Sequence, residues 1–355
     1  MLFARSLPVF FVGLSLAGAL RADTIQVPAE AATIQAAADL AAEGDVVLIA
    51  KGTYAEAVTL SAIAGVTFRG QGKVILTPSI EEGNAPAFTL AFSADVVFES
   101  LEFEGFADAI EVTQVQRLVV RDCVFRENTI AVNLNNVSQA SVRDCRVDSG
   151  STGVQVAGGE AVVITENRFK VTATGVNVSS GEQHIVDDNK FTGGLFGIFL
   201  GGTTSQVELN DNLIRDVANI GIALAGGGHR VLGNTLKKCG TGIRSSFGAA
   251  HTLYTIADNR VLQSAVDGIF LRASESRVMR NIVKKTGGSG IAADAVNIQV
   301  VRNTVSATGG AGLRAVGNDG SFVGNKVKKS GGDAISVEGT GNFFAGNQPS
   351  TPFDL

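Results

Sequence analysis

Arginine, aspartate and phenylalanine side chains recur through the second half of this 355-residue chain at intervals close to multiples of 22. Such a set could bind an acidic sugar, because a guanidinium binds a carboxylate bidentately and an aromatic ring packs on an apolar sugar face. An arginine beside a carboxylate, or two carboxylates, could also perform acid/base catalysis. The predicted catalytic residues are Arg244, Asp267, Arg272 and Asp294. The predicted substrate-binding residues are Phe199, Phe247, His251, Phe270 and Arg314.

A simpler interpretation of these residues is a set of solvated ion pairs between neighbouring segments, each contributing little to stability. The residue types alone favour ion pairs over catalysis. The chain has no Trp, no Cys-x-x-Cys, no His-Glu-x-x-His and no phosphate-binding loop. Its 3 His and 2 Met make copper handling a poor fit, since copper sites need imidazole or soft sulfur ligands.

The elements that must position these side chains follow a repeat of about 22 residues. An asparagine recurs with steps of 22, 23, 22, 25, 22, 22, 22 and 22, at Asn167, Asn189, Asn212, Asn234, Asn259, Asn281, Asn303, Asn325 and Asn347. A Gly-hydrophobic tetrapeptide such as GVNV at 175 keeps the same period. Short alternating apolar stretches between Gly and Asn bends predict three strands per repeat. We therefore expect an all-β solenoid of about 13 coils, with parallel strands stacked ~4.8 Å apart and each Asn at a left-handed bend.

Two cysteines, Cys123 and Cys145, occupy the asparagine position in two early repeats. Stacking on adjacent coils would permit a disulfide between them. Two buried thiols are the alternative, and we favour it because cysteine commonly fills apolar cores as a thiol.

The chain divides into three parts. Residues 1–22 contain Arg5 followed by an apolar run from Leu7 to Leu20, which predicts a signal peptide and export. Residues 23–60 are expected to form an N-terminal cap and first coil, with a helix from Thr33 to Ala42. Residues 61–355 are expected to form the solenoid.

The segment TIQAAADLAAEGDVVLIAKGTYAEAV at 33–58, together with the asparagine repeat, resembles the N-terminal cap and asparagine ladder of the pectin-lyase-like superfamily. The resemblance implies a right-handed parallel β-helix whose open end is plugged by the helix. It also implies a ligand groove along the outward residues of the GVNV column. Members of that superfamily include polysaccharide lyases, hydrolases, epimerases and adhesins, so the resemblance is specific for fold rather than function.

Charged residues beside the asparagine column suggest two further features. An acidic column precedes it, formed by Asp122, Asp144, Glu166, Asp188, Asp211 and Asp258, and basic residues follow it at Arg146, Arg168, Lys190 and Arg260. Because stacked like charges repel, we expect these acids and bases to pair. The alternative is a calcium site, for which the candidates are Asp187, Asp188 and Asp211.

The lysine pairs Lys237–Lys238, Lys284–Lys285 and Lys328–Lys329 form a discontinuous stripe. This stripe could meet an anionic polymer, although a solvated face that discourages aggregation is the commoner role. His184 and His229 fall at inward positions, so buried hydrogen-bonded imidazoles are expected in preference to metal ligands.

The leading hypothesis is an exported protein, secreted or periplasmic, that binds an extracellular and preferably anionic polysaccharide. If the protein is catalytic, β-elimination is the expected mechanism, with Arg244 or Arg272 neutralising a uronate beside a basic group. The alternative is a non-catalytic surface scaffold or adhesin-like solenoid. The net charge of −5 argues against nucleic acid as a partner. We expect a monomer without a membrane span, and calcium is the one cofactor left open.

Overall fold

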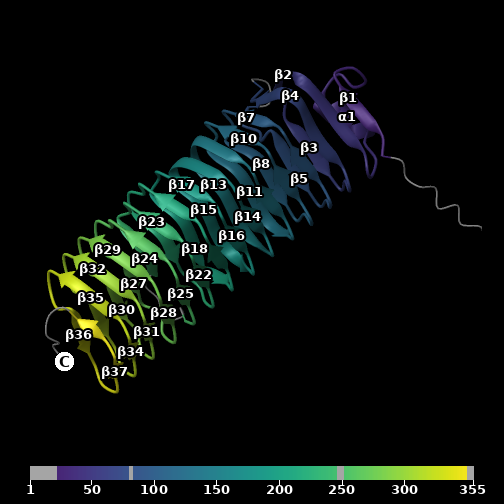
Figure 1. Ribbon diagram of the computed structural model, residues 1–355. Coiled ribbons are helices and arrows are strands. Elements are labelled where there is room, and N and C mark those ends of the chain that lie inside the picture. Colours follow the sequence, from purple (N-terminus) through teal and green to yellow (C-terminus); the bar gives the residue numbers. More distant parts are fainter. Residues whose placement is uncertain (1–21, 80–82, 246–251, 350–355) are drawn as a thin grey trace, which may run out of the picture.

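The computed structural model describes residues 22–79, 83–245 and 252–349. They form one elongated solenoid of about 14 turns, close to the 13 expected, which confirms the parallel β-helix (Figure 1). The predicted signal peptide lies almost wholly outside the described residues. Among the described residues, no helix has the length and apolar composition needed to cross a bilayer.

Three parallel sheets run the length of the solenoid, and each turn of the chain contributes one strand to each sheet. The long strands β2(Val46–Ala55) and β4(Thr67–Thr77) join the second and third sheets, whereas β13(Arg146–Glu160) and β15(Arg168–Glu182) join the third and first. The first sheet also contains β3(Val58–Ser61), β5(Phe88–Ala91), β8(Asp108–Thr113), β11(Ile130–Ser138), β18(Phe196–Ser205), β21(Ile220–Leu224), β24(Thr241–Ser245), β27(Ile269–Leu271), β30(Ile291–Asp294), β33(Leu313–Val316) and β36(Ile335–Glu338).

The other two sheets are built from shorter strands. The second sheet contains β1(Thr24–Val27), β6(Val97–Glu99), β9(Val119–Arg121), β12(Ser141–Arg143), β14(Val163–Thr165), β16(Ile185–Asp187), β19(Glu208–Asn210), β22(Arg230–Leu232), β25(Thr255–Ala257), β28(Arg277–Met279), β31(Gln299–Val301), β34(Ser321–Val323) and β37(Phe343–Ala345). The third sheet contains β7(Glu102–Glu104), β10(Val124–Arg126), β17(Lys190–Thr192), β20(Leu213–Arg215), β23(Thr235–Lys237), β26(Arg260–Leu262), β29(Ile282–Thr286), β32(Thr304–Thr308), β35(Lys326–Ser330) and β38(Gln348–Pro349).

The helix α1(Ile34–Leu40) lies at the N-terminal end of the solenoid and buries Ile34 and Ala37 against the first strands (Figure 1). Thr33 caps it by accepting the Ala36 N–H at 3.0 Å. It ends before the predicted Ala42 because Asp45 accepts the Ala42 N–H at 2.8 Å and so draws the chain into the next turn.

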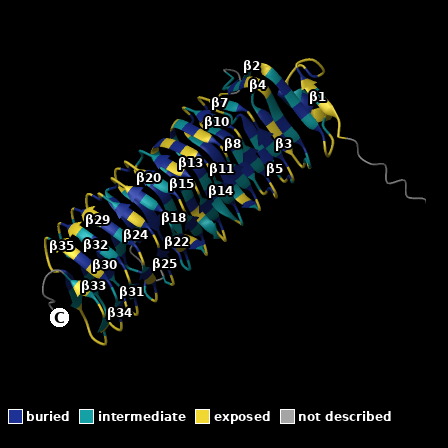
Figure 2. Cartoon of the chain, viewed as in Figure 1, coloured by how far each residue is buried: buried dark blue, intermediate teal, exposed yellow. Residues whose placement is uncertain are grey.

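The interior of the solenoid is filled by columns of aliphatic and aromatic side chains, one residue from each turn. Rings on successive turns stack nearly parallel, as Phe169 does on Phe191 with centroids 4.9 Å apart. Buried residues follow the strands along the whole length, and exposed ones concentrate at the turns and on outward strand positions (Figure 2). Alternation along each short strand therefore sets which side chains are available to a ligand.

The asparagine column lies buried between the second and third sheets. Asn234 shows the pattern: its Nδ2 donates to Asn259 Oδ1 at 3.0 Å and to the Leu209 carbonyl at 2.7 Å. Its Oδ1 accepts the backbone and side-chain N–H groups of Asn212, both at 3.0 Å. Each asparagine thus links its turn to the turns before and after it.

The left-handed bend belongs to the residue before each asparagine, so its expected assignment to the asparagine itself was wrong. Asp188, Asp211 and Asp258 have φ values of 49°, 49° and 60°. Aspartate adopts this conformation more readily than most residues because its short polar side chain bonds locally. The acidic column therefore has a backbone reason to exist.

Cys123 and Cys145 are buried free thiols, as favoured above. The Cys123 Sγ donates to the Arg121 carbonyl at 3.2 Å, and the Cys145 Sγ donates to the Arg143 carbonyl at the same distance. Burial raises the pKa of the Cys145 thiol well above its usual value, so this thiol stays protonated at neutral pH.

His184 and His229 are fully buried acceptors of backbone hydrogen bonds, as expected. The Nδ1 of His184 accepts the Val162 N–H at 3.2 Å, and the Nδ1 of His229 accepts the Val207 N–H at 3.1 Å. Both imidazoles join a turn to the turn before it.

Burial makes His184 a source of acid sensitivity, because desolvation lowers its pKa below 6.5. The folded state holds the neutral form, so the unfolded state binds more protons as the pH falls. The stabilisation is complete above the unfolded pKa of about 6.5 and is lost as the pH falls toward the folded pKa. We expect the urea midpoint to drop over this range, and to drop less in His184→Gln; equal drops would contradict the assignment.

Candidate functional site

The outer face of the first sheet lines up the predicted site residues across successive turns. Strand register places Phe199 beside Ala223, Ala223 beside Arg244, and Arg244 beside Phe270. The same column continues through Ala292 to Arg314. Ala292 points outward yet is only 2% exposed, because its register partners Phe270 and Arg314 are much larger.

Asp294 lies between two arginines. Its Oδ1 accepts from Arg314 Nη1 at 2.9 Å, and its Oδ2 lies 3.4 Å from Arg272 Nη2. The side chains are 24%, 41% and 36% exposed for Asp294, Arg314 and Arg272, so water screens the pairs. Their contribution is to hold two guanidinium groups in place rather than to stabilise the fold.

Phe270 positions a third arginine in the same group. The guanidinium carbons of Arg244 and Arg272 each lie 5.5 Å from the centroid of the Phe270 ring, within the range of a cation–π contact. The ring is thus partly occupied by protein groups, which makes it an orienting side chain more than a sugar platform. We call Arg244, Phe270, Arg272, Asp294 and Arg314 the arginine cluster.

Ser245 supports the cluster and was missed from the sequence. Its buried Oγ accepts the backbone N–H of Arg272 at 2.7 Å. This bond ties β24 to the end of β27 beneath the side chains of Arg244 and Arg272. The only signal was its place after Arg244 in the repeat GIRS, where other repeats carry a hydrophobic residue or alanine.

Asp267 does not belong to the arginine cluster. Its Oδ1 accepts the Ser289 N–H at 2.7 Å and so joins its turn of the solenoid to the next turn. Among the described residues no arginine pairs with it, so it is not part of this group of charges, and its catalytic role stays a prediction. Phe199 lies in the same column as the cluster, with its ring edge-on to Phe196 at 5.4 Å. The predicted Phe247 and His251 lie outside the described residues.

The cluster brings three guanidinium groups and one carboxylate to a half-buried face. A net positive site of this kind binds carboxylate, sulfate or phosphate groups. N-terminal to it, the outward column changes to amides, where Asn133 Nδ2 donates to Asp108 Oδ2 at 3.0 Å and Gln155 Nε2 donates to Asn133 Oδ1 at 3.4 Å. Amides of this kind suit sugar hydroxyls.

The calcium candidates Asp187, Asp188 and Asp211 lie near the same bend on two neighbouring turns, and calcium binding there stays a prediction. Burial, followed by repulsion from Asp211 and Asp188, raises the pKa of the Asp187 carboxyl. The three acids are therefore close enough to repel. Yet in the described part of the chain no three acidic, histidine or cysteine side chains converge to hold an ion.

The expected pairing between the acidic column and the following bases was also wrong. Arg146 pairs with Asp148 on its own strand at 2.6 Å. Asp144 pairs with Arg143, and Asp258 with Arg280 on the next turn. Across the described residues, Arg168, Lys190 and Arg260 form no ion pair.

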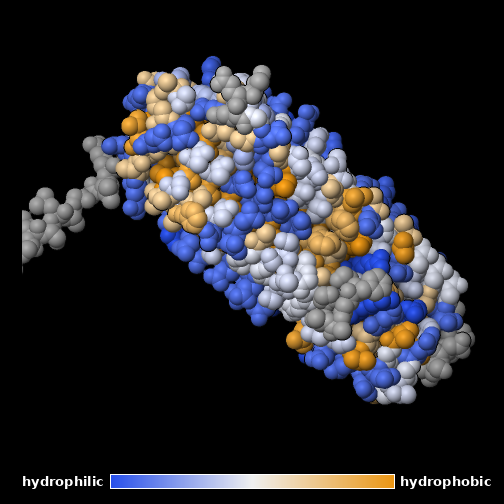
Figure 3. All heavy atoms as spheres, turned by 180° about the vertical axis from the view of Figure 1, so that it is seen from behind, coloured by the Kyte–Doolittle hydropathy of each residue, from blue (hydrophilic) through white to orange (hydrophobic). Residues whose placement is uncertain are grey.

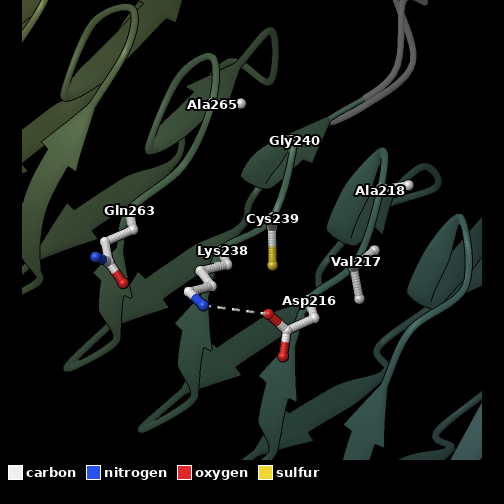
Figure 4. Close-up of a pocket in the computed structure, with 8 residues that line it drawn as sticks. All are labelled: Asp216, Val217, Ala218, Lys238, Cys239, Gly240, Gln263 and Ala265. Carbon is white, nitrogen blue, oxygen red and sulfur yellow. Dashed lines mark ion pairs between the residues drawn. The ribbon is translucent and has the colours of Figure 1, made fainter.

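A separate hollow of about 340 Å³ opens at the turns between the third and first sheets (Figure 4). Lys238 and Asp216 form an exposed ion pair at 3.9 Å at its side. Burial raises the pKa of Cys239 there to about 11, so its thiol is no nucleophile at neutral pH. Seen from behind, hydrophilic and hydrophobic residues both lie along the surface of the molecule (Figure 3).

A family model for the right handed beta helix region matches residues 64–214 and 196–348, which is most of the chain. A comparison with curated proteins found no match.

Solved structures share the fold at low identity. The catalytic unit of an α-1,3-glucanase of family GH87 from Streptomyces thermodiastaticus strain HF3-3 has a TM-score of 0.68 and 18% identity, covering 87% of this chain and 65% of that one. A PL6 alginate lyase in complex with a trisaccharide has a TM-score of 0.59 and 14% identity, covering 86% and 84%. The surface adhesin PfbA of Streptococcus pneumoniae has a TM-score of 0.55 and 12% identity, covering 90% of both chains. At these identities the likeness shows the fold alone.

Proposed function

Because the chain belongs to the right-handed β-helix family, we propose from this premise that it binds an anionic polysaccharide along the outer face of its first sheet. The observation that carries the proposal is the arginine cluster, where Arg272 and Arg314 approach one carboxylate from two sides. A guanidinium has five N–H donors, and Asp294 engages one nitrogen of Arg314. The remaining donors of Arg314 suit a uronate carboxylate.

The polymer would lie along the solenoid axis, crossing the strands. The outward column runs in that direction, and Phe199 lies three turns before Phe270, about 14 Å at the stacking distance of parallel strands. Phe199 would pack against a sugar face while the arginine cluster binds acidic groups of later sugars.

The names of the solved relatives support a polysaccharide as the ligand. They include an α-1,3-glucanase, a PL6 alginate lyase and a periplasmic alginate epimerase. Because the arginine cluster is positively charged, we propose that the polysaccharide is an acidic one. We also place this binding outside the cytoplasm, as the leader-like residues 1–22 predict.

Binding is tested with the double variant Arg272→Gln/Arg314→Gln. We expect its Kd for an alginate oligosaccharide, measured by calorimetry, to rise about tenfold, a loss of about 1.4 kcal/mol. The matched control is Arg277→Gln/Arg302→Gln, which removes equal charge from two exposed arginines elsewhere and should bind as the native protein does. Equal losses in both variants would show nonspecific attraction and overturn the site.

Cleavage by β-elimination is the second activity, favoured by the lyase relatives. Elimination needs a base at the sugar C5 as well as a neutralised uronate. Within the arginine cluster the only candidate base is Asp294, and each of its oxygens faces an arginine. We therefore propose binding without cleavage. The native protein would be a lyase if it released unsaturated uronate, detected by ultraviolet absorbance, and if Asp294→Asn abolished that release. This result would reject binding without cleavage.

A non-catalytic adhesin or scaffold is the alternative to a carbohydrate receptor. The fold likeness to the adhesin PfbA, over 90% of both chains, favours it. Retention on immobilised alginate but not on neutral dextran supports the polysaccharide proposal, whereas no retention on any polysaccharide supports the scaffold.

A further inference from the structure

The outer face of the third sheet carries a run of cations that the proposed function does not use. Over strands β15, β17, β20, β23 and β26, its outward positions hold Arg168, Lys170, Lys190, Arg215, Lys237 and Arg260. We call this set the basic lane. All six side chains are exposed, and within the third sheet the outward positions of these strands hold no carboxylate. This concentration of positive charge stands out in a chain whose net charge is −5.

Strand register aligns the lane along the solenoid axis. Arg168 lies beside Lys190, and Arg215 lies beside Lys237. Arg260 lies in the same column as Lys190, three turns later, because the register runs from Lys190 through Leu213 and Thr235 to Arg260. Five stacked strands give the lane a length of about 19 Å. The lane therefore has the shape of a track for an extended chain.

Without a bound anion, the basic lane lowers the stability of the folded protein. Like charges on neighbouring strands repel each other, and among the described residues none of the six cations has an ion-pair partner. A hollow of about 440 Å³ opens among Arg146, Arg168, Lys170, Lys190 and Arg215, and the one carboxylate in its lining, Asp148, is paired with Arg146. A surface that only kept the protein soluble would mix both signs of charge, so the lane points to an anionic occupant.

The surroundings of the lane select the kind of polyanion. The exposed acids Glu166, Asp188 and Asp211 run along one side of it, in the turns that precede its strands. They would repel a wide duplex or a flat anionic membrane while leaving room for one narrow chain. The outward positions also hold no aromatic ring, which single-stranded nucleic acid needs for base stacking and membrane surfaces favour for insertion.

We propose that the basic lane is a second binding site, which takes a single linear polysaccharide bearing carboxylate or sulfate groups. It shares only the class of polymer with the proposed function, because it lies on a different sheet from the arginine cluster. Lys284 and Lys328 extend the same face toward the C-terminal end, where exposed residues follow β29 and β35 (Figure 2). A long polymer would therefore meet several further cations.

The test compares three variants by affinity electrophoresis in alginate, dextran sulfate and neutral dextran. The lane variant is Lys170→Gln/Lys190→Gln/Arg215→Gln. Its matched control is Lys51→Gln/Arg277→Gln/Arg302→Gln, which removes equal charge from exposed residues outside both sites. The third is the double variant of the arginine cluster. Circular dichroism establishes that each is folded.

We expect the lane variant to lose at least about tenfold in affinity for one or both charged polymers, with a shallower salt dependence. Loss for alginate identifies carboxylate as the ligand group, and loss for dextran sulfate identifies sulfate. If only the lane variant loses affinity, the basic lane is a binding site and the arginine cluster is not. If only the arginine-cluster variant loses affinity, the basic lane is rejected. Equal behaviour of the lane variant and its matched control overturns the lane. Tighter binding of the native protein to single-stranded DNA or anionic vesicles, added as competitors in the same gels, also overturns it.

Discussion

Replacing Asn234 with alanine is expected to lower the free energy of unfolding by about 3 kcal/mol, because it leaves two buried polar groups of the preceding turn without a partner. The Asn212 backbone N–H would lose its acceptor, Asn234 Oδ1, and the Leu209 carbonyl would lose its donor, Asn234 Nδ2. Both sites are closed to water, since Asn212 and Asn234 are buried to within 1%. Urea unfolding followed by circular dichroism measures the loss.

The matched control is Asn219→Ala, at an exposed asparagine in a neighbouring turn. A substitution there should change the unfolding free energy by no more than about 0.5 kcal/mol. If Asn234→Ala and Asn219→Ala unfold at the same urea concentration, the asparagine column does not hold the turns together. A broadened transition in Asn234→Ala would show that the turns on its two sides unfold separately, as repeat proteins do when an interface weakens.

The repeat made the fold predictable from sequence because stacking constrains the same position on every turn. Asn must recur where a buried side chain bonds the turns before and after it. A residue tolerant of positive φ must recur just before it, and Asp211 and Asp258 satisfy that need. Sequence could not say which of the two neighbours takes the left-handed conformation, because Asn and Asp both tolerate it.

The arginine cluster was predictable in part, for a different physical reason. Register placed Arg244, Phe270 and Arg314 in one column, since that depends only on the repeat. Side-chain partners depend instead on rotamers that the local turn decides. Asp267 accepts the Ser289 N–H of the next turn instead of pairing with an arginine, and Arg146 bonds Asp148 two residues away. A partner on the same strand, such as Asp148 for Arg146, costs less chain and side-chain entropy to hold than a partner on another turn.

The same reasoning explains why the basic lane was seen only in fragments. Its lysines fall in pairs such as Lys237–Lys238, which suggested a stripe built from both members. In the structure Lys237 points outward from the third sheet, whereas Lys238 takes a positive φ in the following turn and faces Asp216. Arg168 and Lys190 were assigned to acids they do not contact. Once those pairings are removed, the outward cations of successive strands become one surface.

Replacing Gly290 with alanine is the second change expected to cost about 3 kcal/mol, because the interior has no room for a methyl group there. A Cβ at this position would lie 2.2 Å from Val305 Cγ1 and 2.7 Å from the Gly312 carbonyl oxygen. One neighbour is a core side chain and the other is the backbone of the next turn, so relief requires the strands to move apart. Thermal and urea unfolding measure the cost.

Gly202→Ala is the matched control, since a Cβ there would meet nothing within 4 Å. It should be neutral or slightly stabilising, because alanine restricts the unfolded chain. Equal destabilisation by both changes would mean that close packing against the next turn does not explain the cost of Gly290→Ala.

A double-mutant cycle with Val305→Ala separates the two contacts of Gly290. Removing the Val305 methyl groups relieves the clash with Cγ1 but leaves the Gly312 carbonyl in place. We expect Gly290→Ala to cost less in the Val305→Ala background, with a coupling of about 1 kcal/mol. The strand that starts beside Gly290 ends at Asp294, so the backbone shift that remains should also disturb the arginine cluster. If Gly290→Ala binds alginate more weakly while Gly202→Ala binds as the native protein does, the packing of the turns sets the spacing of the guanidinium groups. If both variants bind alginate unchanged, the arginine cluster tolerates movement of its strand.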